Sequence, residues 1–358
     1  MKVLVIGQGG REHCIIQALK KSKRIRKLYC ARGNAGIAKD AECVPINAED
    51  ISALVQFAYD NKIDYTVVGP EQPLAEGIVD IFRKEKLNIF GPVKQAAILE
   101  SSKVACKNLL KQWKIPTADY RVFSHFDEAK KYVDNGHFPL VLKADGLCQG
   151  KGVLICKTKG EAEKALRQFF TDKAFGKAGE TIVIEEFLEG QELSIIALSD
   201  GKNFFCFPPS QDHKRVFDND EGPNTGGMGA YSPVPIASPE LLKRVEQEIM
   251  RKTIDGMYKD VAPFKGFLYA GLMITANNEP YVLEYNVRLG DPETQVLLPK
   301  LKSDLLGLML AADKGGLDTN TVEWDSRACV CVVLTSGGYP GAYQKGKVIK
   351  GLDTVAEK

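Results

Sequence analysis

The segment 143-KADGLCQGKG-152 lies between two apolar runs with strand character, Pro139–Leu142 and Val153–Cys156. A Walker-type phosphate loop has four residues between its two glycines and a Ser or Thr before a helix. Here three residues separate the first two glycines and a strand follows the last, so the segment is not a Walker loop. It is a glycine-rich hairpin whose backbone amides can close over phosphate groups, with Lys143 at its base as a fixed positive charge. A plain exposed hairpin would not require three glycines and two lysines so close together, so we favour a phosphate-binding flap.

The sequence around this hairpin predicts two α+β lobes. Residues 120–187 give strand, helix, strand, glycine loop, strand, helix and strand, which is typical of a small lobe with antiparallel pairs. A long helix is expected over 239–257 in the second lobe. The strands of that lobe are expected near 193–198, 203–207, 267–274 and 281–287.

The last strand of the first lobe, Ile182–Leu188, runs into a polar turn that contains Glu192. A strand edge of this kind can offer N–H and C=O groups to an adenine, and a carboxylate soon after it can hold ribose hydroxyls. Most strands with this pattern are only structural, so the order of the motifs along the chain carries the interpretation.

The first hundred residues alternate short β-branched runs with amphipathic helical segments, which predicts a parallel sheet with right-handed crossovers. Such sheets bind ligands at the carboxyl ends of their strands. Three of those ends are rich in glycine or turn residues, namely Gly7–Gly10, Gly33–Gly36 and Gly69–Glu71. We therefore expect a ligand crevice at this edge of the sheet.

The first of these turns, Gly7-Gln8-Gly9-Gly10-Arg11-Glu12, departs from a dinucleotide fingerprint at its last position. The second strand also ends at Cys30-Ala31-Arg32, with no acidic residue for a ribose, which argues against a nicotinamide dehydrogenase. Backbone N–H groups at this turn and the charge of Arg11 would suit a phosphorylated sugar. The alternative is that the glycines serve only a tight turn.

The segment 282–293, Val-Leu-Glu-Tyr-Asn-Val-Arg-Leu-Gly-Asp-Pro-Glu, predicts a strand with one chemical face. Alternation places Glu284, Asn286 and Arg288 together. The apolar residues expected on the opposite face are Leu283, Tyr285 and Val287. A carboxylate and an amide oxygen two residues apart suit Mg²⁺, and the arginine could clamp a carboxylate or a transferring phosphoryl group. A half-exposed strand with random polar residues explains the alternation but not this set.

Two further polar segments, Ser210–Arg215 and Pro223–Gly229, flank the expected nucleotide cleft in sequence. The glycines of the second permit close backbone approach to a ligand. Either segment could instead be an ordinary surface loop.

Composition excludes several classes of protein. The 48 Lys and Arg residues nearly balance the 46 Asp and Glu residues, so we expect neither nucleic acid nor a membrane as a partner. Nine cysteines without a C-x-x-C pair and four scattered histidines indicate neither a disulfide framework nor a zinc site. Any metal should lie on oxygen ligands. Neither a signal peptide nor a transmembrane segment is evident, which predicts a cytoplasmic protein.

The order of these motifs resembles the glycinamide ribonucleotide synthetase family of purine biosynthesis. The resemblance runs from Met1 to Lys358 and includes Gln211–Arg215 and Gly222–Met228. It implies α/β and α+β architecture: an amino-terminal α/β domain over 1–102, an ATP-grasp domain over 103–324 with a mobile lobe at about 117–188, and the start of a carboxyl-terminal domain over 325–358. That family's last domain continues for several tens of residues more, so we expect the apolar strand Ala328–Leu334 to lack part of its cover.

The resemblance also implies functional residues. ATP-binding residues would be Lys103, Lys143, Gly146, Gly150, Lys151, Gly152, Glu186, Leu188 and Glu192. Substrate-binding residues would be Gly9, Gly10, Arg11, Glu12, Pro70, Glu71, Asp212, Gly226, Gly227, Met228, Arg288, Asp291, Pro292 and Glu293. Lys143, Arg288 and Asp212 would be catalytic. Glu284 and Asn286 would hold Mg²⁺ or Mn²⁺.

The implied reaction joins glycine to 5-phosphoribosylamine through glycyl phosphate, with ATP converted to ADP and phosphate, in a monomer or weak homodimer. Two alternatives stay open. A carboxylating relative would activate bicarbonate instead of glycine, and a non-catalytic nucleotide-binding protein would need no such chemistry. Intact Lys143, Glu284, Asn286 and Arg288 speak against the second.

Overall fold

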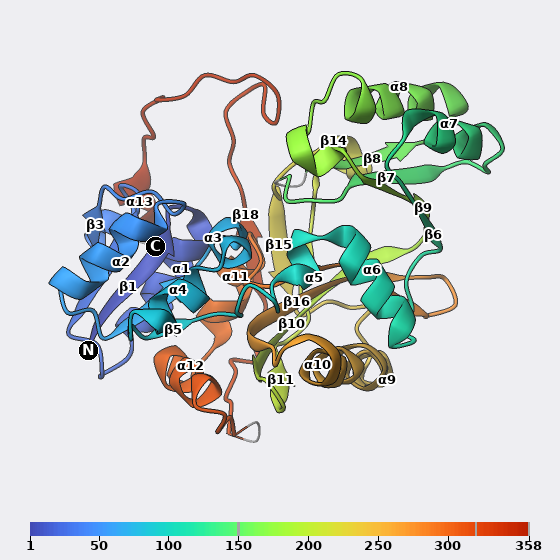
Figure 1. Ribbon diagram of the computed structural model, residues 1–358. Coiled ribbons are helices and arrows are strands. Elements are labelled where there is room, and N and C mark those ends of the chain that lie inside the picture. The colour runs from blue at the N-terminus through green and yellow to red at the C-terminus, as the bar shows by residue number, and fades with distance from the viewer. Residues whose placement is uncertain (149–150, 319–320, 357–358) are drawn as a thin grey trace.

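The computed structural model describes residues 1–148, 151–318 and 321–356 (Figure 1). The chain begins with a five-stranded parallel sheet in the order β3-β2-β1-β4-β5. Its strands are β1 (Lys2–Gly7), β2 (Lys27–Arg32), β3 (Glu42–Val44), β4 (Tyr65–Val68) and β5 (Ile89–Phe90). Its helices are α1 (Gly10–Lys20), α2 (Ile51–Asp60), α3 (Glu71–Glu76) and α4 (Ile78–Lys84), with a 3₁₀ turn, η1 (Ile37–Lys39). The predicted parallel sheet is confirmed, and two short edge strands, β3 and β5, extend it.

Helices α5 (Ile98–Ser101) and α6 (Lys103–Gln112) lead from this sheet into the first α+β lobe. That lobe contains a four-stranded antiparallel sheet in the order β6-β9-β7-β8, with the predicted succession of elements. The elements are β6 (Tyr120–Phe123), α7 (Phe126–Asp134), β7 (Leu140–Ala144), β8 (Val153–Cys156), α8 (Lys159–Phe170), η2 (Gly176–Gly179) and β9 (Ile182–Glu186). In Figure 1 α7 and α8 cover one face of this sheet, and their apolar side chains form its separate core.

The second lobe is built on an antiparallel sheet in the order β11-β10-β16-β17. Its strands are β10 (Gln191–Asp200), β11 (Phe204–Cys206), β16 (Lys265–Ile274) and β17 (Pro280–Asn286). One face packs on a helical segment made of α9 (Pro239–Arg244), η4 (Val245–Arg251), α10 (Lys252–Gly256) and η5 (Met257–Val261). This segment contains the predicted helix and continues past it.

The other face of the second sheet packs on α12 (Leu305–Asp313). Apolar residues of β1 and β4 belong to the same core cluster as α12, and the Tyr65 hydroxyl donates to the Met309 carbonyl at 3.4 Å. The amino-terminal sheet and the second lobe therefore share a continuous core. No helix among the described residues is long and apolar enough to cross a membrane.

A β-bulge interrupts β17 where it passes β16. Gly271 pairs with Glu284 and Leu272 pairs with Val282, which leaves Leu283 as the extra residue. Such a bulge shifts the side-chain alternation by one position. The prediction that Leu283 lies on the core face was wrong, because the bulge turns it toward a cavity that Glu284 also lines. Tyr285 and Val287 lie in the core as expected.

The remaining strands form a small sheet, β12-β15-β18, and a hairpin of β13 and β14, and short helices complete the chain. Their bounds are β12 (Gln211–Asp212), β13 (Arg215–Phe217), η3 (Asp218–Asp220), β14 (Glu221–Asn224), β15 (Gly229–Ser232), α11 (Thr294–Leu297), η6 (Leu298–Lys300), β18 (Cys329–Val332) and α13 (Leu352–Ala356). Strand β18 is shorter than predicted, and it pairs with β15 on one edge. Val330 and Val332 on β18 are exposed. Among the described residues the other edge of β18 has no partner strand.

Candidate active site

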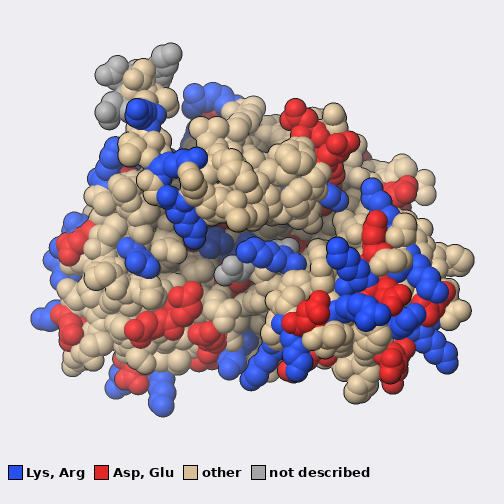
Figure 2. Space-filling model, turned by 90° about the horizontal axis from the view of Figure 1, so that it is seen from above, with Lys and Arg blue, Asp and Glu red and all other residues tan. Residues whose placement is uncertain are grey.

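A cavity of about 300 Å³ lies where the amino-terminal sheet, α6 and the two lobes meet. Figure 2 shows a hollow on this side of the molecule, with Lys and Arg side chains around it. The predicted site residues that line the cavity are Arg11, Glu71, Lys103, Lys143, Gly146, Gly152, Asp212, Gly226, Glu284, Asn286, Arg288, Asp291 and Glu293. Arg11 and Glu71, which follow two strand ends of the first sheet, thus line the same cavity as the residues of the predicted nucleotide cleft.

The other predicted residues lie near this lining or outside the described part of the chain. The predicted site residues that the structure describes but that do not line the cavity are Gly9, Gly10, Glu12, Pro70, Lys151, Glu186, Leu188, Glu192, Gly227, Met228 and Pro292. Gly150 falls outside the described residues. Lys151 is exposed at the hairpin, and buried Gly227 packs so closely on Pro292 that a Cβ there would lie 2.4 Å from Pro292 Cδ.

Glu12 holds the first strand-to-helix turn together. Its Oε2 accepts the Gly9 N–H at 2.6 Å, and its Oε1 accepts the Arg11 Nε–H at 2.6 Å. A Cβ on Gly69, just past the end of β4, would lie 2.1 Å from Glu12 Oε1, so this neighbouring strand end needs glycine beside the carboxylate. The side chain that breaks the dinucleotide fingerprint therefore fills the space below the turn instead of facing the cavity.

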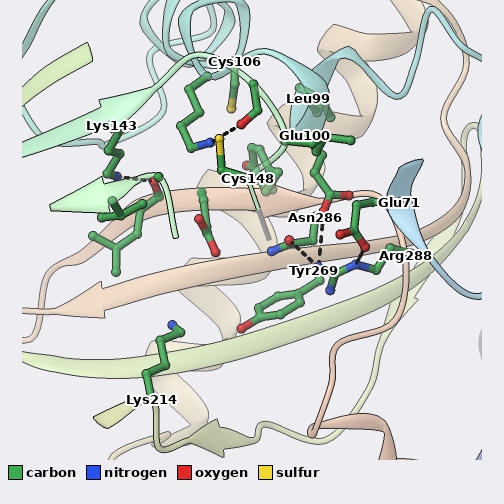
Figure 3. A pocket seen from close by; sticks show the side chains of 18 of the residues that line it. Glu71, Leu99, Glu100, Cys106, Lys143, Cys148, Lys214, Tyr269, Asn286 and Arg288 are labelled. Carbon is green, nitrogen blue, oxygen red and sulfur yellow. Dashed lines mark hydrogen bonds and ion pairs between the residues drawn. The ribbon is translucent and has the colours of Figure 1, made fainter. Parts of the chain in front are cut away.

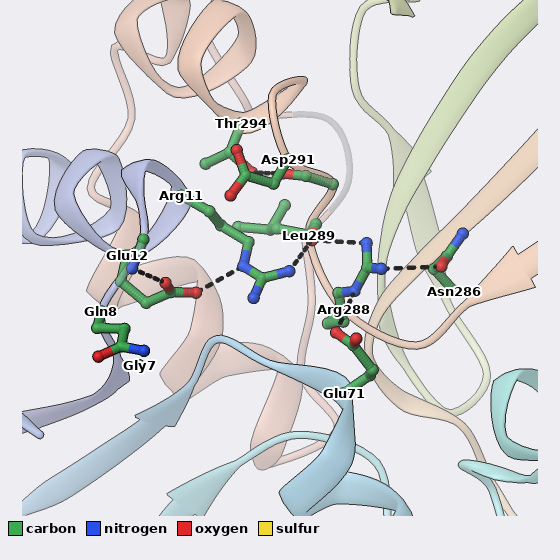
Figure 4. Close-up of polar contacts among 12 residues, drawn as sticks. Gly7, Gln8, Arg11, Glu12, Glu71, Asn286, Arg288, Leu289, Asp291 and Thr294 are labelled. Atoms are coloured by element: carbon green, nitrogen blue, oxygen red, sulfur yellow. Dashed lines mark hydrogen bonds and ion pairs between the residues drawn. The ribbon is translucent and has the colours of Figure 1, made fainter. Parts of the chain in front are cut away.

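Arg11 and Arg288 connect this turn to β17. Arg11 Nη1 donates to the Leu289 carbonyl at 3.3 Å, and Arg288 Nη1 donates to the same carbonyl at 3.2 Å. Arg288 Nη2 continues the path by donating to Asn286 Oδ1 at 3.0 Å. Figure 4 shows this run of contacts from Glu12 to Asn286.

Two carboxylates fix the Arg288 guanidinium. Glu71, from the amino-terminal sheet domain, lies 3.3 Å from Arg288 Nε, and Glu100, from α5, lies 3.3 Å from Arg288 Nη2. Glu100 also accepts the Val287 N–H at 2.7 Å. Burial raises the pKa of Glu100 to about 7, although Arg288 opposes the rise. No pattern in the sequence singled out Glu100.

Glu284 and Asn286 face the cavity from β17. Among the described residues, no hydrogen bond or ion pair engages the Glu284 carboxylate, whereas Asn286 Oδ1 accepts from Arg288. Burial alone would raise the pKa of Glu284, but Lys214 and then Lys143 hold that pKa below its usual value. An ionised carboxylate without a protein partner, beside an amide oxygen, suits a divalent cation that takes its other ligands from phosphates and water. No group of three or more His, Cys, Asp or Glu in the described residues is placed to hold a metal alone.

Lys143 enters the cavity from β7, opposite Lys214 (Figure 3). Its Nζ lies 2.9 Å from Glu185 Oε2 and donates to the Leu283 carbonyl at 3.1 Å. The same Glu185 oxygen lies 3.2 Å from Lys107 Nζ. The sequence singled out Glu186, yet its side chain is exposed and accepts the Asp119 N–H at 2.9 Å. Strand alternation could have identified Glu185, because adjacent residues point to opposite faces.

Helix α6 anchors the base of the glycine hairpin. Lys103 Nζ donates to the Gly146 carbonyl at 3.0 Å. Asp145 Oδ1 accepts the Ser102 hydroxyl at 2.9 Å and the Val104 N–H at 2.8 Å. Lys107 lies one turn beyond Lys103, on the same side of the helix, a spacing that could have identified it from the sequence.

A second group of carboxylates lies around Lys214, and two of its members, Asp212 and Glu293, line the cavity. Lys214 Nζ lies 2.5 Å from Glu192 Oε2 and 3.7 Å from Asp212 Oδ2. Asp212 Oδ1 is buried without a partner in the described part of the chain. Burial raises the pKa of Asp212 to about 7, with Lys214 opposing and Glu293 reinforcing the shift. Glu293 accepts from the Tyr269 hydroxyl at 2.7 Å.

Comparisons with known proteins show which family the chain belongs to. The family model for the N domain of phosphoribosylglycinamide synthetase matches residues 1–100, and the model for its ATP-grasp (A) domain matches residues 101–294. The chain belongs to the phosphoribosylglycinamide synthetase family. It is an ATP-grasp ligase, and the family resemblance noted from the sequence is confirmed.

Individual members of this family are similar over nearly the whole chain. The phosphoribosylamine–glycine ligase of Caldanaerobacter subterraneus subsp. tengcongensis is 47% identical over 357 residues, which cover 100% of this chain and 85% of that protein. The crystal structure of the phosphoribosylamine–glycine ligase from Thermotoga maritima superposes with a TM-score of 0.81 at 37% identity, over 97% of this chain and 83% of that one.

A more distant structure shares only the fold. The biotin carboxylase domain of the 2-oxoglutarate carboxylase from Hydrogenobacter thermophilus, solved with ADP, magnesium and bicarbonate, has a TM-score of 0.72 at 16% identity. It covers 92% of this chain and 73% of its own. This likeness shows a shared fold and no more, whereas the family models support the synthetase.

Proposed function

We propose that this synthetase-family chain ligates glycine to 5-phosphoribosylamine at the cavity described above, using ATP and a divalent cation. The observation that carries the proposal is that the phosphate-directed lysines, the cation-directed oxygens of β17 and the turn around Arg11 line one cavity. Nucleotide, acid and amine could then meet without a large rearrangement of the second lobe. Domain limits at 102 and 324, with a mobile lobe between about 117 and 188, belong to the same proposal.

The first step is phosphoryl transfer to glycine. A glycine carboxylate oxygen attacks the γ-phosphorus of ATP, the new P–O bond forms, and the bond to the β-phosphate oxygen breaks to release ADP. Lys103, Lys143 and the backbone of the glycine hairpin bind the phosphates and offset the charge on them. Glu186 and Leu188 would offer backbone groups to the adenine, and Glu192 would accept ribose hydroxyls.

Glu284 and Asn286 would hold the divalent cation. When bound, Mg²⁺ or Mn²⁺ would neutralise phosphate charge and orient the transferring group. The Glu284 carboxylate is free of protein partners among the described residues, and the Asn286 amide oxygen keeps a lone pair beyond its bond to Arg288, so both oxygens fit the role.

The second step joins the amine. The amino nitrogen of phosphoribosylamine attacks the acyl carbon of glycyl phosphate, the C–N bond forms, the C–O bond to phosphate breaks, and the amine loses a proton. Asp212, with its unpartnered Oδ1, would receive a proton or hold an ammonium group here. Arg11 and the turn at Gly9 and Gly10 would hold the sugar phosphate, next to Pro70 and Glu71.

Gly226, Asp291 and Glu293 line the cavity and would contact the substrates, with Gly227, Met228 and Pro292 next to them in the same two turns. Arg288, held by Glu71 and Glu100, would present a fixed positive charge to the glycine carboxylate or the transferring phosphoryl group.

The deciding experiment measures ADP release from ATP with either glycine or bicarbonate as the acid, with and without phosphoribosylamine. We expect glycine-dependent turnover that requires the amine for a stable product. Release driven by bicarbonate instead of glycine would contradict the proposed substrate, and release that needs neither acid would contradict carboxylate activation.

A further inference from the structure

Two lysines share one buried carboxylate beside the phosphate-directed end of the cavity. Glu185 Oε2 lies 2.9 Å from Lys143 Nζ and 3.2 Å from Lys107 Nζ. The exposed fractions of the three side chains are 7% for Lys143, 4% for Lys107 and 2% for Glu185. Among ion pairs of the described residues, these three groups pair only with one another. Two positive charges and one negative charge leave the group with a net charge of +1.

A closed path of hydrogen bonds fixes this trio on the bulge of β17. Lys107 Nζ donates to Thr117 Oγ1 at 2.6 Å, and that hydroxyl donates to the Val282 carbonyl at 2.6 Å. On the other side, Lys143 donates to the carbonyl of the adjacent residue, Leu283. The bulge thus offers two successive carbonyls to the two ends of the trio. This path joins α6, β7 and β9 to the strand that carries Glu284.

The path assigns different tasks to the two lysines. All three groups line the cavity, and each lysine has one further polar contact besides Glu185. Lys107, the less exposed of the two lysines, donates to the Thr117 side chain, whereas Lys143 donates to a carbonyl of the strand that carries Glu284. Burial lowers the pKa of Lys107, while Glu185 opposes the shift. If Glu185 faced Lys143 alone, the pair would be neutral, and a phosphate would have to compete with a buried carboxylate for the ammonium group. The charge on Lys107 balances Glu185 and removes that competition.

We propose that Lys107 is a positioning residue for nucleotide binding: it neutralises Glu185, so that the charge of Lys143 is available to the phosphates of ATP. This inference rests on the proposed function insofar as it takes Lys143 as a phosphate contact. Lys107 itself touches no phosphate in this account. A purely structural lysine would only tie α6 to Thr117 and β9, and its loss would not depend on whether Glu185 is charged.

The net charge of the trio makes the test specific. Lys107→Met leaves a net charge of zero, whereas the double variant Lys107→Met with Glu185→Gln restores the net charge of +1. Affinity for the Mg²⁺ complex of ADP is measured by calorimetry for both, beside Lys143→Met and the unaltered protein, with melting temperatures recorded for each. We expect Lys107→Met to weaken binding about tenfold and the double variant to return to within about threefold of the unaltered protein.

Each outcome decides one statement. A double variant that binds at least as weakly as Lys107→Met overturns the inference, because charge balance would then play no part. If Lys107→Met does not fold, the double variant alone decides, since a loss of about tenfold or more in it contradicts the inference. A Lys143→Met variant with unchanged affinity would instead overturn the phosphate contact in the proposed function. Lys107→Arg, which keeps the charge, should bind like the unaltered protein.

Discussion

The first turn of the chain and the nucleotide end of the cavity both contain carboxylates, but the protein hydrogen-bonds the carboxylate at the turn and leaves carboxylate oxygens in the cavity without partners. At the turn, Glu12 is 2% exposed and both of its oxygens accept hydrogen bonds from the protein. In the cavity, Glu284 has no partner among the described residues, and Asp212 Oδ1 and Glu185 Oε1 are buried without one. A buried acceptor left unpaired costs free energy unless a ligand satisfies it.

This difference separates scaffold from site. Where the protein satisfies a carboxylate, the carboxylate fixes the backbone, as Glu12 does beneath Gly7 and Gly69. Where it leaves an oxygen unsatisfied next to lysines, a ligand can replace the missing partner. Arg288 lies between the two regions and shares features of both, since it is bound on several sides and still lines the cavity.

The largest effect is expected at Glu284. Because its carboxylate has no protein partner in the described structure, Glu284→Gln should remove a ligand contact without removing a native one. We expect kcat to fall by about 10²- to 10³-fold, comparable to the loss of a key electrostatic group, with little change in melting temperature. Ligase rate and thermal melting are measured side by side.

Glu279→Gln is a matched control, because Glu279 is exposed, lies just before β17 and pairs with Arg244 at the surface. It should leave both quantities nearly unchanged. A Glu284→Gln protein that melts far lower yet keeps its rate per folded molecule would show that the carboxylate belongs to the scaffold.

Glu12 should show the opposite behaviour. Glu12→Ala leaves the Gly9 N–H and the buried Arg11 guanidinium without their carboxylate, so we expect the free energy of unfolding to fall by about 3 to 5 kcal/mol. Urea titration measures this value. Lys20→Ala, which breaks an exposed pair with Asp40, should cost at most about 1 kcal/mol. Equal stability of the two variants would remove the distinction between the regions.

The third prediction concerns Lys143, the lysine that we propose binds the phosphates. Lys143→Ala should raise the dissociation constant for the Mg²⁺ complex of ADP about ten- to a hundredfold, the worth of a hydrogen bond to a charged group. Binding of ribose 5-phosphate, a probe for the sugar phosphate near Arg11, should stay nearly unchanged. Equal losses for both ligands would indicate that Lys143 is structural.

Much of this fold could be predicted from the sequence because it follows from local patterns. Short apolar runs between helical segments predicted strands at β1, β2 and β4, and the spacing of the glycines between β7 and β8 excluded a Walker loop. Strands β3 and β5 were missed because two or three residues carry no period. They form only because β2 and β4 offer open edges beside them.

The site could be predicted only in part, because partners are decided by pairing across the chain. The motif at Glu284, Asn286 and Arg288 was found by alternation, but the bulge at Leu283 depends on the register with β16, which no local pattern encodes. Glu100 approaches Arg288 from 188 residues earlier, and Glu185 meets Lys107 from another element. Which of two adjacent glutamates enters the cavity depends on which face of β9 packs in the lobe's core: Ile182 and Ile184 lie in that core, so Glu185 points the other way.

The smallest expected effect concerns pH, and it depends on Asp212. Burial raises the pKa of this carboxyl from 3.8 to about 7, so the folded protein binds the proton more tightly than the unfolded chain does. The associated stability is complete below about pH 4 and is lost as pH rises through about 7. Activity should change in the other direction, because only the ionised carboxylate can accept a proton or hold an ammonium group.

A single group with this pKa should raise ligase kcat/KM about tenfold between pH 6 and pH 8, from the change in its ionised fraction. Asp212→Asn should remove this rise of kcat/KM with pH and lower the rate at pH 8. At that pH the variant should also unfold at a higher denaturant concentration than the unaltered protein. Rate profiles and urea titrations across this range check both statements. If kcat/KM still rises with pH in Asp212→Asn, another group titrates. Glu100, whose pKa is also about 7, would then be tested with Glu100→Gln. Glu100 contacts Arg288 and the Val287 N–H, so a pH dependence due to Glu100 would reflect a change in how Arg288 is held.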